Sequence, residues 1–233
     1  INGLTLEGPA LEPGRESFVG ALAGLPVRHG MTVGELALMY RGEKQLPLEL
    51  EVVQLEGWRR SMWFDQTGQP WVNPSPNMRN LNQALLYPGI GLLETTNLSV
   101  GRGTDSPFER VGAPWLDAAP LAERLNAAGL AGVRCYPFWF TPAASKYAGA
   151  RCGGLYFIIT DRDAFRALPL GISVARLLRE HSAGQWNHAP IDRLYGRAEI
   201  VRQLDDNASA DAIAAGWEPG VEEFRRRRAA YLL

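Results

Sequence analysis

The segment 94–105 concentrates side chains that suit a polar ligand. Glu94 follows a short apolar run, and hydroxyl, amide and guanidinium groups follow it up to Asp105. A guanidinium offers a planar pair of donors to a carboxylate, and hydroxyl and amide groups match those of a sugar. We therefore predict a site for a sugar or a carboxylated sugar. Its candidate residues are Glu94, Thr95, Thr96, Asn97, Arg102 and Thr104.

The same segment also has a purely structural interpretation. In a turn, Thr and Asn side chains bond to nearby backbone groups, while Gly101 and Gly103 supply positive φ angles. Ligands in α/β folds bind just outside the carboxyl ends of strands. Residues 90–93 are apolar enough for a short strand that ends where the polar loop begins. This placement favours a binding site over a plain turn.

A second candidate lies at residues 28–32, where His29 follows Arg28 ahead of an expected helix. The free N–H groups of a helix N-terminus attract anions, and Arg28 would strengthen that attraction. His29 could carry a proton or donate a hydrogen bond to a ligand. A single histidine at such a position more often caps or packs at the helix entrance, so the residue alone does not establish a site.

Other classes of site are poorly supported. Glu94 stands where a dinucleotide-binding Gly-x-Gly-x-x-Gly motif that begins at Gly89 needs its third glycine. The three histidines lack zinc-ligand spacing, and no Gly-x-Ser-x-Gly elbow is present. We expect no metal and no cofactor. The 24 basic and 25 acidic residues argue against a nucleic-acid partner, and no apolar run approaches the ~18 residues of a membrane span.

The first half of the chain must hold these residues in place. Thr32 and Glu35 have the spacing of a capping box, which predicts a helix that begins there. Residues 48–55 alternate apolar and acidic side chains as a half-buried strand does. Asn77 is placed to cap a helix through Leu86 that stops at 87–89. With the strand at 90–93, the pattern is typical of an α/β layer.

The second half reads as a smaller α+β domain, with a boundary near residue 115 where prolines cluster. We predict strands at 133–140 and 155–160, a helix at 170–181 and a last helix from Pro219. In that helix, Glu222 and Glu223 precede Arg226 and Arg227 by four residues, which predicts that the arginine run 225–228 is a solvated, self-paired face. Cys135 and Cys152 could form one disulfide or stay as two buried thiols, with neither interpretation favoured.

Several motifs together resemble the NamZ/YbbC family of exo-β-N-acetylmuramidases. The similarity extends over essentially the whole chain and is most specific between residues 73 and 104. Its motifs are Ile1-Asn2-Gly3, Glu7-Gly8-Pro9, Ser17-Phe18-Val19-Gly20, Arg28-His29-Gly30-Met31-Thr32 with Glu35, Gly57-Trp58, Pro74-Ser75-Pro76-Asn77, Glu94-Thr95-Thr96-Asn97, Gly101-Arg102-Gly103-Thr104, Lys146-Tyr147, Cys152-Gly153-Gly154 and the Arg-rich last helix.

The resemblance implies a fold of two parts. Residues 1–115 would be the C-terminal part of a Rossmann-like catalytic domain, and 116–233 a smaller α+β auxiliary domain. Family members also carry an upstream segment whose Pro-Glu-His-Gly motif holds a candidate catalytic acid, and that motif does not occur here. Since the sequence also begins at Ile1, we expect the chain to be a fragment or a processed product.

The resemblance also implies a function. Members remove terminal N-acetylmuramic acid from peptidoglycan fragments outside the cytoplasm, so we expect a periplasmic or secreted glycoside hydrolase acting on small MurNAc–GlcNAc glycans. Glu94 would be catalytic with His29 beside it, and Arg28 or Arg102 would pair with the lactyl carboxylate of muramic acid. Two alternatives remain: a non-catalytic amino-sugar-binding module, and an unrelated α/β hydrolase that uses His29 with a carboxylate.

Overall fold

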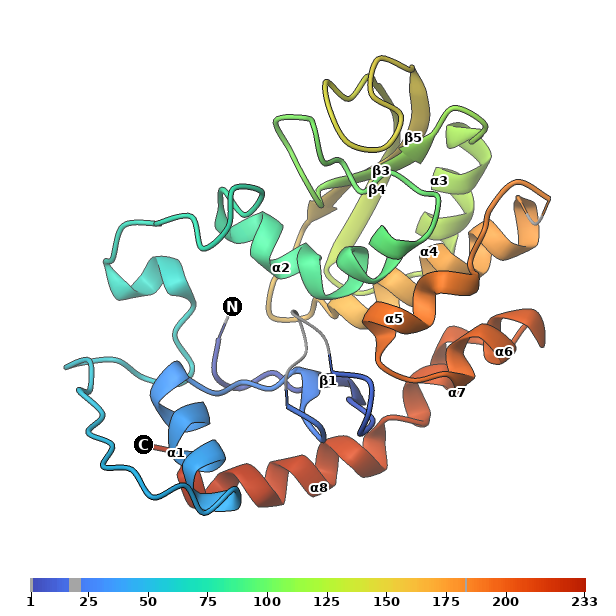
Figure 1. Ribbon diagram of the computed structural model, residues 1–233. Helices are drawn as coiled ribbons and strands as arrows, with labels where there is room; N and C mark the ends of the chain where they lie inside the picture. Colours follow the sequence, from blue (N-terminus) through green and yellow to red (C-terminus); the bar gives the residue numbers. More distant parts are fainter. Residues whose placement is uncertain (1, 17–21, 183) are drawn as a thin grey trace.

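The computed structural model describes residues 2–16, 22–182 and 184–233, which form a mixed helix-and-sheet fold (Figure 1). The strands are β1 (Glu7–Ala10), β2 (Pro26–Arg28), β3 (Arg110–Ala113), β4 (Val133–Phe140) and β5 (Cys152–Ile159). The longer helices are α1 (Val33–Glu43), α2 (Leu81–Ile90), α3 (Ala118–Ala127), α4 (Ala167–His181) and α8 (Glu218–Arg228). Short helices are α5 (Asp192–Tyr195), α6 (Glu199–Asp205), α7 (Ala210–Ala215) and the 3-10 turns η1 (Phe64–Thr67), η2 (Gly91–Thr95), η3 (Ala189–Ile191) and η4 (Ala229–Tyr231).

Two small antiparallel sheets organise the described chain. One pairs β1 with β2, and the other has the order β3-β5-β4. Helix α3 packs on β4 and β5, so Leu155 and Phe157 of β5 are buried in the main core. The predicted strands at 133–140 and 155–160 are confirmed as β4 and most of β5. Strand β3 lies before residue 115 and pairs with β5 after it.

Helices α2 and α4 cross with backbone against backbone. At the crossing Gly89 faces Gly171, and a Cβ on Gly89 would lie 1.9 Å from the carbonyl oxygen of Ala167. A Cβ on Gly171 would lie 2.4 Å from the carbonyl oxygen of Gly89. Only glycine fits at so close an approach. The crossing fixes the direction in which the chain leaves α2, and therefore the place of η2, which carries Glu94.

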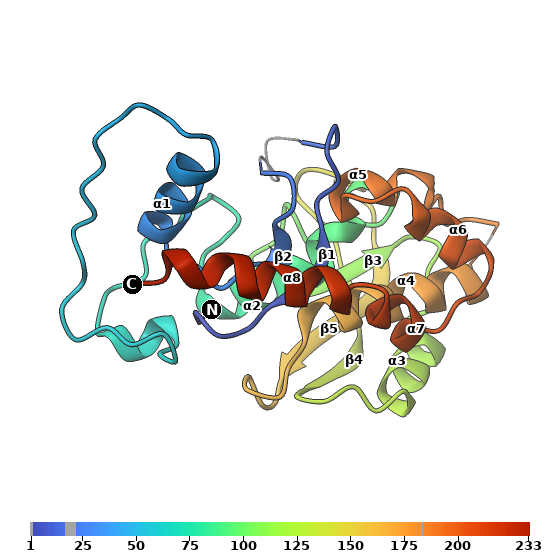
Figure 2. The same cartoon turned by 90° about the horizontal axis from the view of Figure 1, so that it is seen from below.

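The last helix joins the two ends of the described chain. In Figure 2, α8 runs across β1 and β2 toward α1, where the C-terminus lies. Arg228 is buried, and its Nη1 donates to the carbonyl oxygens of Gly3, His29 and Gly30 at 3.3, 3.0 and 2.9 Å. Arg227 pairs with Glu43 on α1 at 2.7 Å. The prediction of a solvated, self-paired arginine run is therefore wrong for Arg227 and Arg228.

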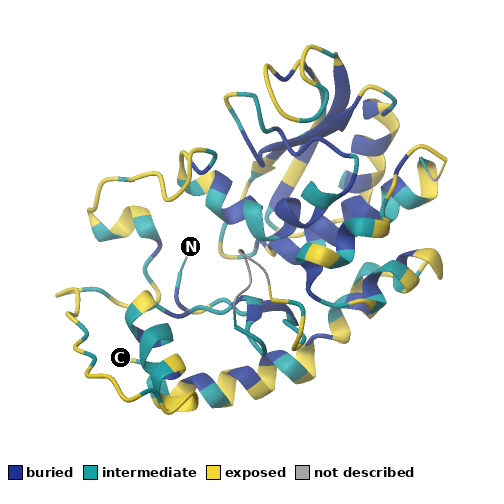
Figure 3. Ribbon diagram, in the orientation of Figure 1, coloured by how far each residue is buried: buried dark blue, intermediate teal, exposed yellow. Residues whose placement is uncertain are grey.

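Three predicted elements differ from those observed. Residues 48–55 form no strand, and Leu48, Val53 and Leu55 are exposed, because no described strand pairs with this segment (Figure 3). A half-buried strand needs a partner on which to bury its apolar face.

The helix expected from Asn77 begins instead at Leu81, with Asn80 as its cap, and continues through Pro88 to Ile90. Proline removes only one helical N–H so close to the end of the helix, and packing on α4 supports the last turn. The strand predicted at 90–93 is likewise wrong, because those residues complete α2 and enter η2. Glu94 thus ends no strand, which removes the strand-end reason for a site there.

The structure confirms the predicted starts of helices α1 and α8 and shows the state of the two cysteines. Thr32 caps α1 in a capping box with Glu35, and α8 begins at Glu218 next to the predicted Pro219. Cys152 is paired with Phe140 across the sheet, five positions along β4 from Cys135, which places the cysteines ~17 Å apart along the strands. Both are free and buried, so the two-thiol interpretation is correct, and burial raises the pKa of Cys135 to about 11.

Among the described residues, none of the helices is both long enough and apolar enough to cross a bilayer.

We predict that Gly89→Ala destabilises the protein by about 2–3 kcal/mol, because the added methyl group cannot fit against the Ala167 carbonyl oxygen. Gly220→Ala is the matched control: this helical glycine has its nearest neighbour at 3.8 Å, and the change should stabilise by up to about 1 kcal/mol. Urea unfolding of the three proteins measures both effects. Equal free energies of unfolding for Gly89→Ala and the parent would contradict the crossing geometry.

We also predict that Arg228→Met lowers the free energy of unfolding by about 2–4 kcal/mol, since it removes the side-chain donor of the Gly3 and His29 carbonyl groups and one of the two donors to Gly30. Arg226→Met, an exposed position on the same helix, should change it by less than about 0.5 kcal/mol. Thermal and urea unfolding compare the pair. Similar losses for both variants would show that the Arg228 contacts contribute little.

Candidate functional site

Glu94 lies in a cluster of charged side chains from three segments. Arg102 Nη2 donates to Glu94 Oε2 at 3.1 Å, and Arg102 Nε contacts Oε1 in the same ion pair. Lys146, from the loop between β4 and β5, donates through Nζ to the backbone carbonyl oxygen of Glu94. Glu94 and Arg102 are each about a quarter to a third exposed, at 25% and 30%. The cluster is thus ordered by internal contacts while staying open to a ligand.

Close packing of two loops brings Lys146 to this cluster. Ala143 N donates to the carbonyl oxygen of Gly103 at 2.8 Å, and a Cβ on Gly103 would lie 2.1 Å from the carbonyl oxygen of Ala144. The hydroxyl of Tyr147 donates to the carbonyl oxygen of Asn97 at 2.6 Å. Sequence reasoning missed Lys146 as a site residue. Its only signal was its place in a motif of the resembled family, far along the chain from Glu94.

Three of the predicted binding residues are engaged within the fold. The hydroxyl of Thr96 donates to the carbonyl of Leu93, and that of Thr104 to the carbonyl of Gly101, both at 2.7 Å. The side chain of Asn97 bonds to backbone groups of residues 185–187. These contacts to nearby backbone groups are the ones expected if the segment is a structural turn and not a binding site. Thr95 Oγ1 differs, because it is buried and has no hydrogen-bond partner among the described residues.

Arg28 is not placed to bind a ligand. It is buried in an ion pair with Glu7 at 2.5 Å, and the other oxygen of Glu7 accepts from the backbone N–H of Leu168 at 3.1 Å. The pair therefore ties β1 and β2 to the start of α4. Burial lowers the pKa of Arg28, and the charge of Glu7 opposes that shift. The expected pairing of Arg28 with a substrate carboxylate is not supported, because the partner position is filled by Glu7.

The N-terminus of α1 is also occupied. Thr32 Oγ1 accepts from the N–H of Glu35, and Glu35 accepts from the N–H of Thr32. Glu35 is fully buried, pairs with Arg60 and accepts from the N–H of Leu233 at 3.0 Å. Hydrogen bonds from these donors outweigh burial and hold the pKa of Glu35 below its ordinary value. The anion that this helix terminus attracts is therefore the protein's own carboxylate.

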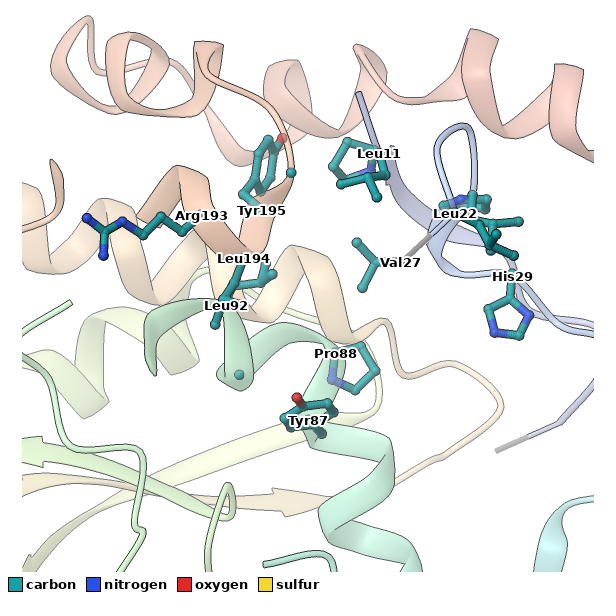
Figure 4. Close-up of a pocket in the computed structure, with 15 residues that line it drawn as sticks. Leu11, Leu22, Val27, His29, Tyr87, Pro88, Leu92, Arg193, Leu194 and Tyr195 are labelled. Carbon is teal, nitrogen blue, oxygen red and sulfur yellow. The ribbon is translucent and has the colours of Figure 1, made fainter. Parts of the chain in front are cut away.

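His29 borders a cavity of about 370 Å³ (Figure 4). The walls come from the β1–β2 region, α2, η2 and α5, and they are mostly apolar, with Val27 and Leu92 among them. His29 Nδ1 accepts from the N–H of Met31 at 3.2 Å, which leaves the proton of the neutral ring on Nε2. Burial lowers the pKa of His29, and the nearby charge of Arg228 adds to the shift. A neutral His29 can donate through Nε2.

Tyr87 connects this cavity to the Glu94 cluster. Its ring lines the cavity and meets Phe108 edge-on with ring centres 4.7 Å apart, and Arg102 lies 5.2 Å from the centre of Phe108. Burial raises the pKa of Tyr87, the charge of Glu94 adds to the shift, and Arg102 opposes it. The ring of Tyr87 therefore joins the cavity wall, through Phe108, to the Arg102 side of the cluster. Together the cavity wall and the cluster offer an apolar surface beside donors and one carboxylate.

Within residues 2–16, 22–182 and 184–233, no three His, Cys, Asp or Glu side chains come together as a potential metal site.

Comparison with known proteins identifies one family along the chain. The family model for the N-terminal part of exo-beta-N-acetylmuramidase NamZ matches residues 1–82, and the model for its C-terminal part matches 85–233. Peptidoglycan beta-N-acetylmuramidase NamZ of Bacillus subtilis (strain 168) is 39% identical over 231 residues. The match covers 98% of this chain and 56% of that protein, so the chain spans little more than half the length of this curated relative.

Solved structures share the fold. A DUF1343 family protein from Bacteroides fragilis superposes with a TM-score of 0.91 at 30% sequence identity. A second DUF1343 family protein from the same organism gives 0.78 at 28% identity. Each match covers 100% of this chain and 63% of the other. The mixed helix-and-sheet architecture is therefore that of this family.

We predict that His29 makes stability fall as the solution becomes acidic. The unfolded chain binds a proton near the ordinary histidine pKa of 6.5, whereas the folded protein keeps the ring neutral to lower pH. The stabilising contribution is thus complete above pH 6.5 and is lost as pH falls below it, with a slope of at most ~1.4 kcal/mol per pH unit.

Urea unfolding between pH 8 and 5.5 measures this slope. His29→Asn, which keeps an acceptor for the Met31 N–H, should flatten the profile, and the exposed control His181→Asn should leave it unchanged. A His29→Asn profile as steep as that of the parent would assign the acid sensitivity to other groups.

Proposed function

Because the chain belongs to the NamZ family of exo-β-N-acetylmuramidases, we propose that it supplies residues that release terminal N-acetylmuramic acid from peptidoglycan fragments. The observation that carries this proposal is the Glu94–Arg102 pair, whose Arg102 lies over Phe108 next to Tyr87, a residue in the wall of the cavity that His29 also borders. Glycoside hydrolysis requires a proton donor for the leaving oxygen and a second group that attacks or stabilises the anomeric carbon. A cluster with a fixed carboxylate suits the second role.

Glu94 is better placed as an ionised group than as the acid. Both of its oxygens face Arg102, so they accept hydrogen bonds rather than hold a proton for a leaving group. We assign Glu94 to the anomeric carbon and Arg102 to holding Glu94 in position. Neutral His29 would bond to the sugar through Nε2 from the other side of the cavity.

We further propose that residues 1–115 belong to a Rossmann-like domain whose remaining strands lie in the part of the relatives that this chain does not span. Residues 48–55 have the alternation of a strand, yet Leu48, Val53 and Leu55 are exposed and no described strand pairs with the segment. Pairing with strands from that part would bury them. An enzyme acting on peptidoglycan turnover products works where they arise, so we propose a periplasmic or secreted location.

A second candidate function is a non-catalytic amino-sugar-binding module. It is favoured by the same Glu94–Arg102 contact, since a carboxylate committed to an arginine can orient a ligand without reacting. The two functions differ in outcome. Mass spectrometry of N-acetylmuramyl-N-acetylglucosamine incubated with the protein detects free N-acetylmuramic acid only if hydrolysis occurs. Tight binding without release, also after the chain is joined to the upstream segment of the relatives, would favour the module.

We predict that Glu94→Gln lowers kcat on muramyl substrates by at least about a hundredfold, because the amide cannot stabilise positive charge at the anomeric carbon. The matched control is Glu222→Gln, which removes a carboxylate from an exposed Glu–Arg pair on α8 and should leave kcat unchanged. Release of N-acetylmuramic acid is measured for both variants in the form of the protein that turns over substrate. Near-parental rates for Glu94→Gln would remove Glu94 from the reaction.

A further inference from the structure

Lys146 is an unusual cation for this chain. The sequence contains two lysines, Lys44 and Lys146, among 24 basic residues, so nearly every other positive charge is an arginine. Lys44 is exposed at the end of α1, whereas Lys146 is partly buried against Glu94. An ammonium is a compact point charge with three donors, unlike the planar fork of arginine. Its position calls for a structural or a binding explanation.

The contacts of Lys146 leave most of its bonding capacity free. Its Nζ donates to the backbone carbonyl of Glu94, and among the described residues it has no other hydrogen-bond acceptor and no acidic side chain within 4.0 Å. The carboxylate of Glu94 is committed to Arg102. Two cations therefore share one carboxylate. Burial lowers the pKa of Lys146, the charge of Glu94 opposes that shift, and the nearby Arg102 adds to it. Two partly buried cations that share one carboxylate leave a positive charge unbalanced, and a negatively charged ligand would compensate it.

The backbone holds Lys146 in this place at some cost. Ser145 and Tyr147 on either side have φ angles of 69° and 59°, in the left-handed region that such residues seldom adopt. Contacts of the loop with Gly103 and Asn97 maintain that conformation. Strained backbone that surrounding contacts preserve is frequent at ligand-binding sites.

We propose that Lys146 is a specificity-determining residue that binds the lactyl carboxylate of muramic acid. The inference rests on the proposed function, in which Glu94 faces the anomeric carbon. On the sugar ring, the oxygen that carries the lactyl group is two carbons away from the anomeric carbon. A cation that contacts the backbone of Glu94 therefore has the reach to meet that substituent. N-acetylglucosamine lacks the lactyl group, so the interaction selects between two otherwise identical sugars.

Turnover of two substrates tests this assignment. We compare 4-nitrophenyl β-N-acetylmuramide with 4-nitrophenyl β-N-acetylglucosaminide in the form of the protein that turns over substrate. Lys146→Met and Lys146→Gln should lower kcat/KM for the muramide about ten- to a hundredfold, the range of a charge-assisted hydrogen bond, and leave the glucosaminide within about twofold. Lys146→Arg should keep most of the selectivity, and Lys44→Met should change neither substrate. Equal losses on both substrates, or no loss on either, would overturn the proposal.

Binding separates this inference from the proposed function. If the parent protein hydrolyses neither substrate, the proposed function fails, and calorimetry with free N-acetylmuramic acid and free N-acetylglucosamine then decides the role of Lys146. We expect at least a tenfold preference for N-acetylmuramic acid in the parent and its loss in Lys146→Met. A parent without preference, or a Lys146→Met variant that keeps the preference, would show that Lys146 does not read the carboxylate. Unfolding midpoints confirm that the variants are folded.

Discussion

The crossing of α2 and α4 is the constraint on which the rest of the site depends. Gly89 and Gly171 let the two backbones touch, and no larger residue could stand at either position without moving a helix. Close packing of this kind has few alternative arrangements, because interiors are as dense as organic crystals. The position of helix α2 therefore fixes both Tyr87, which lines the cavity, and η2, which follows α2 directly. The orientation of Glu94 follows from a contact that contains no polar side chain.

Buried charges fix the opposite wall of the cavity. Glu7 joins Arg28 on β2 to the first turn of α4, and Arg228 on α8 holds the carbonyl groups around His29. A buried ion pair contributes little net stability, because both groups lose their hydration. The two groups must nevertheless stay in contact, since separating them would leave each charge buried and unpaired. These pairs therefore act mainly by fixing where β2 and His29 lie relative to α4.

Local signals in the sequence predicted much of the secondary structure but not its assembly. The Thr32 capping box and the apolar strands β4 and β5 depend on neighbouring residues, and all three were predicted correctly. The segment 48–55 failed because a strand exists only with a partner. The run 90–93 failed because a short apolar run fits a buried helical turn as well as a strand. Nothing in the sequence around Arg228 indicated that its side chain bonds to the carbonyl groups of Gly3, His29 and Gly30.

In the candidate site, too, the types of residue could be predicted from the sequence but their tertiary partners could not. Residue types around Glu94 indicated a polar site in which Arg102 pairs with a ligand carboxylate, whereas in the structure Arg102 pairs with Glu94 itself. The strand predicted to end at Glu94 does not form, because Glu94 lies in η2. Lys146 could not be placed from the sequence, because its approach depends on backbone packing between Gly103 and Ala144. Residue chemistry can therefore be predicted locally, whereas the partner that completes a site depends on tertiary packing. In this chain that packing leaves two cations around one carboxylate, an arrangement that a negatively charged ligand would balance.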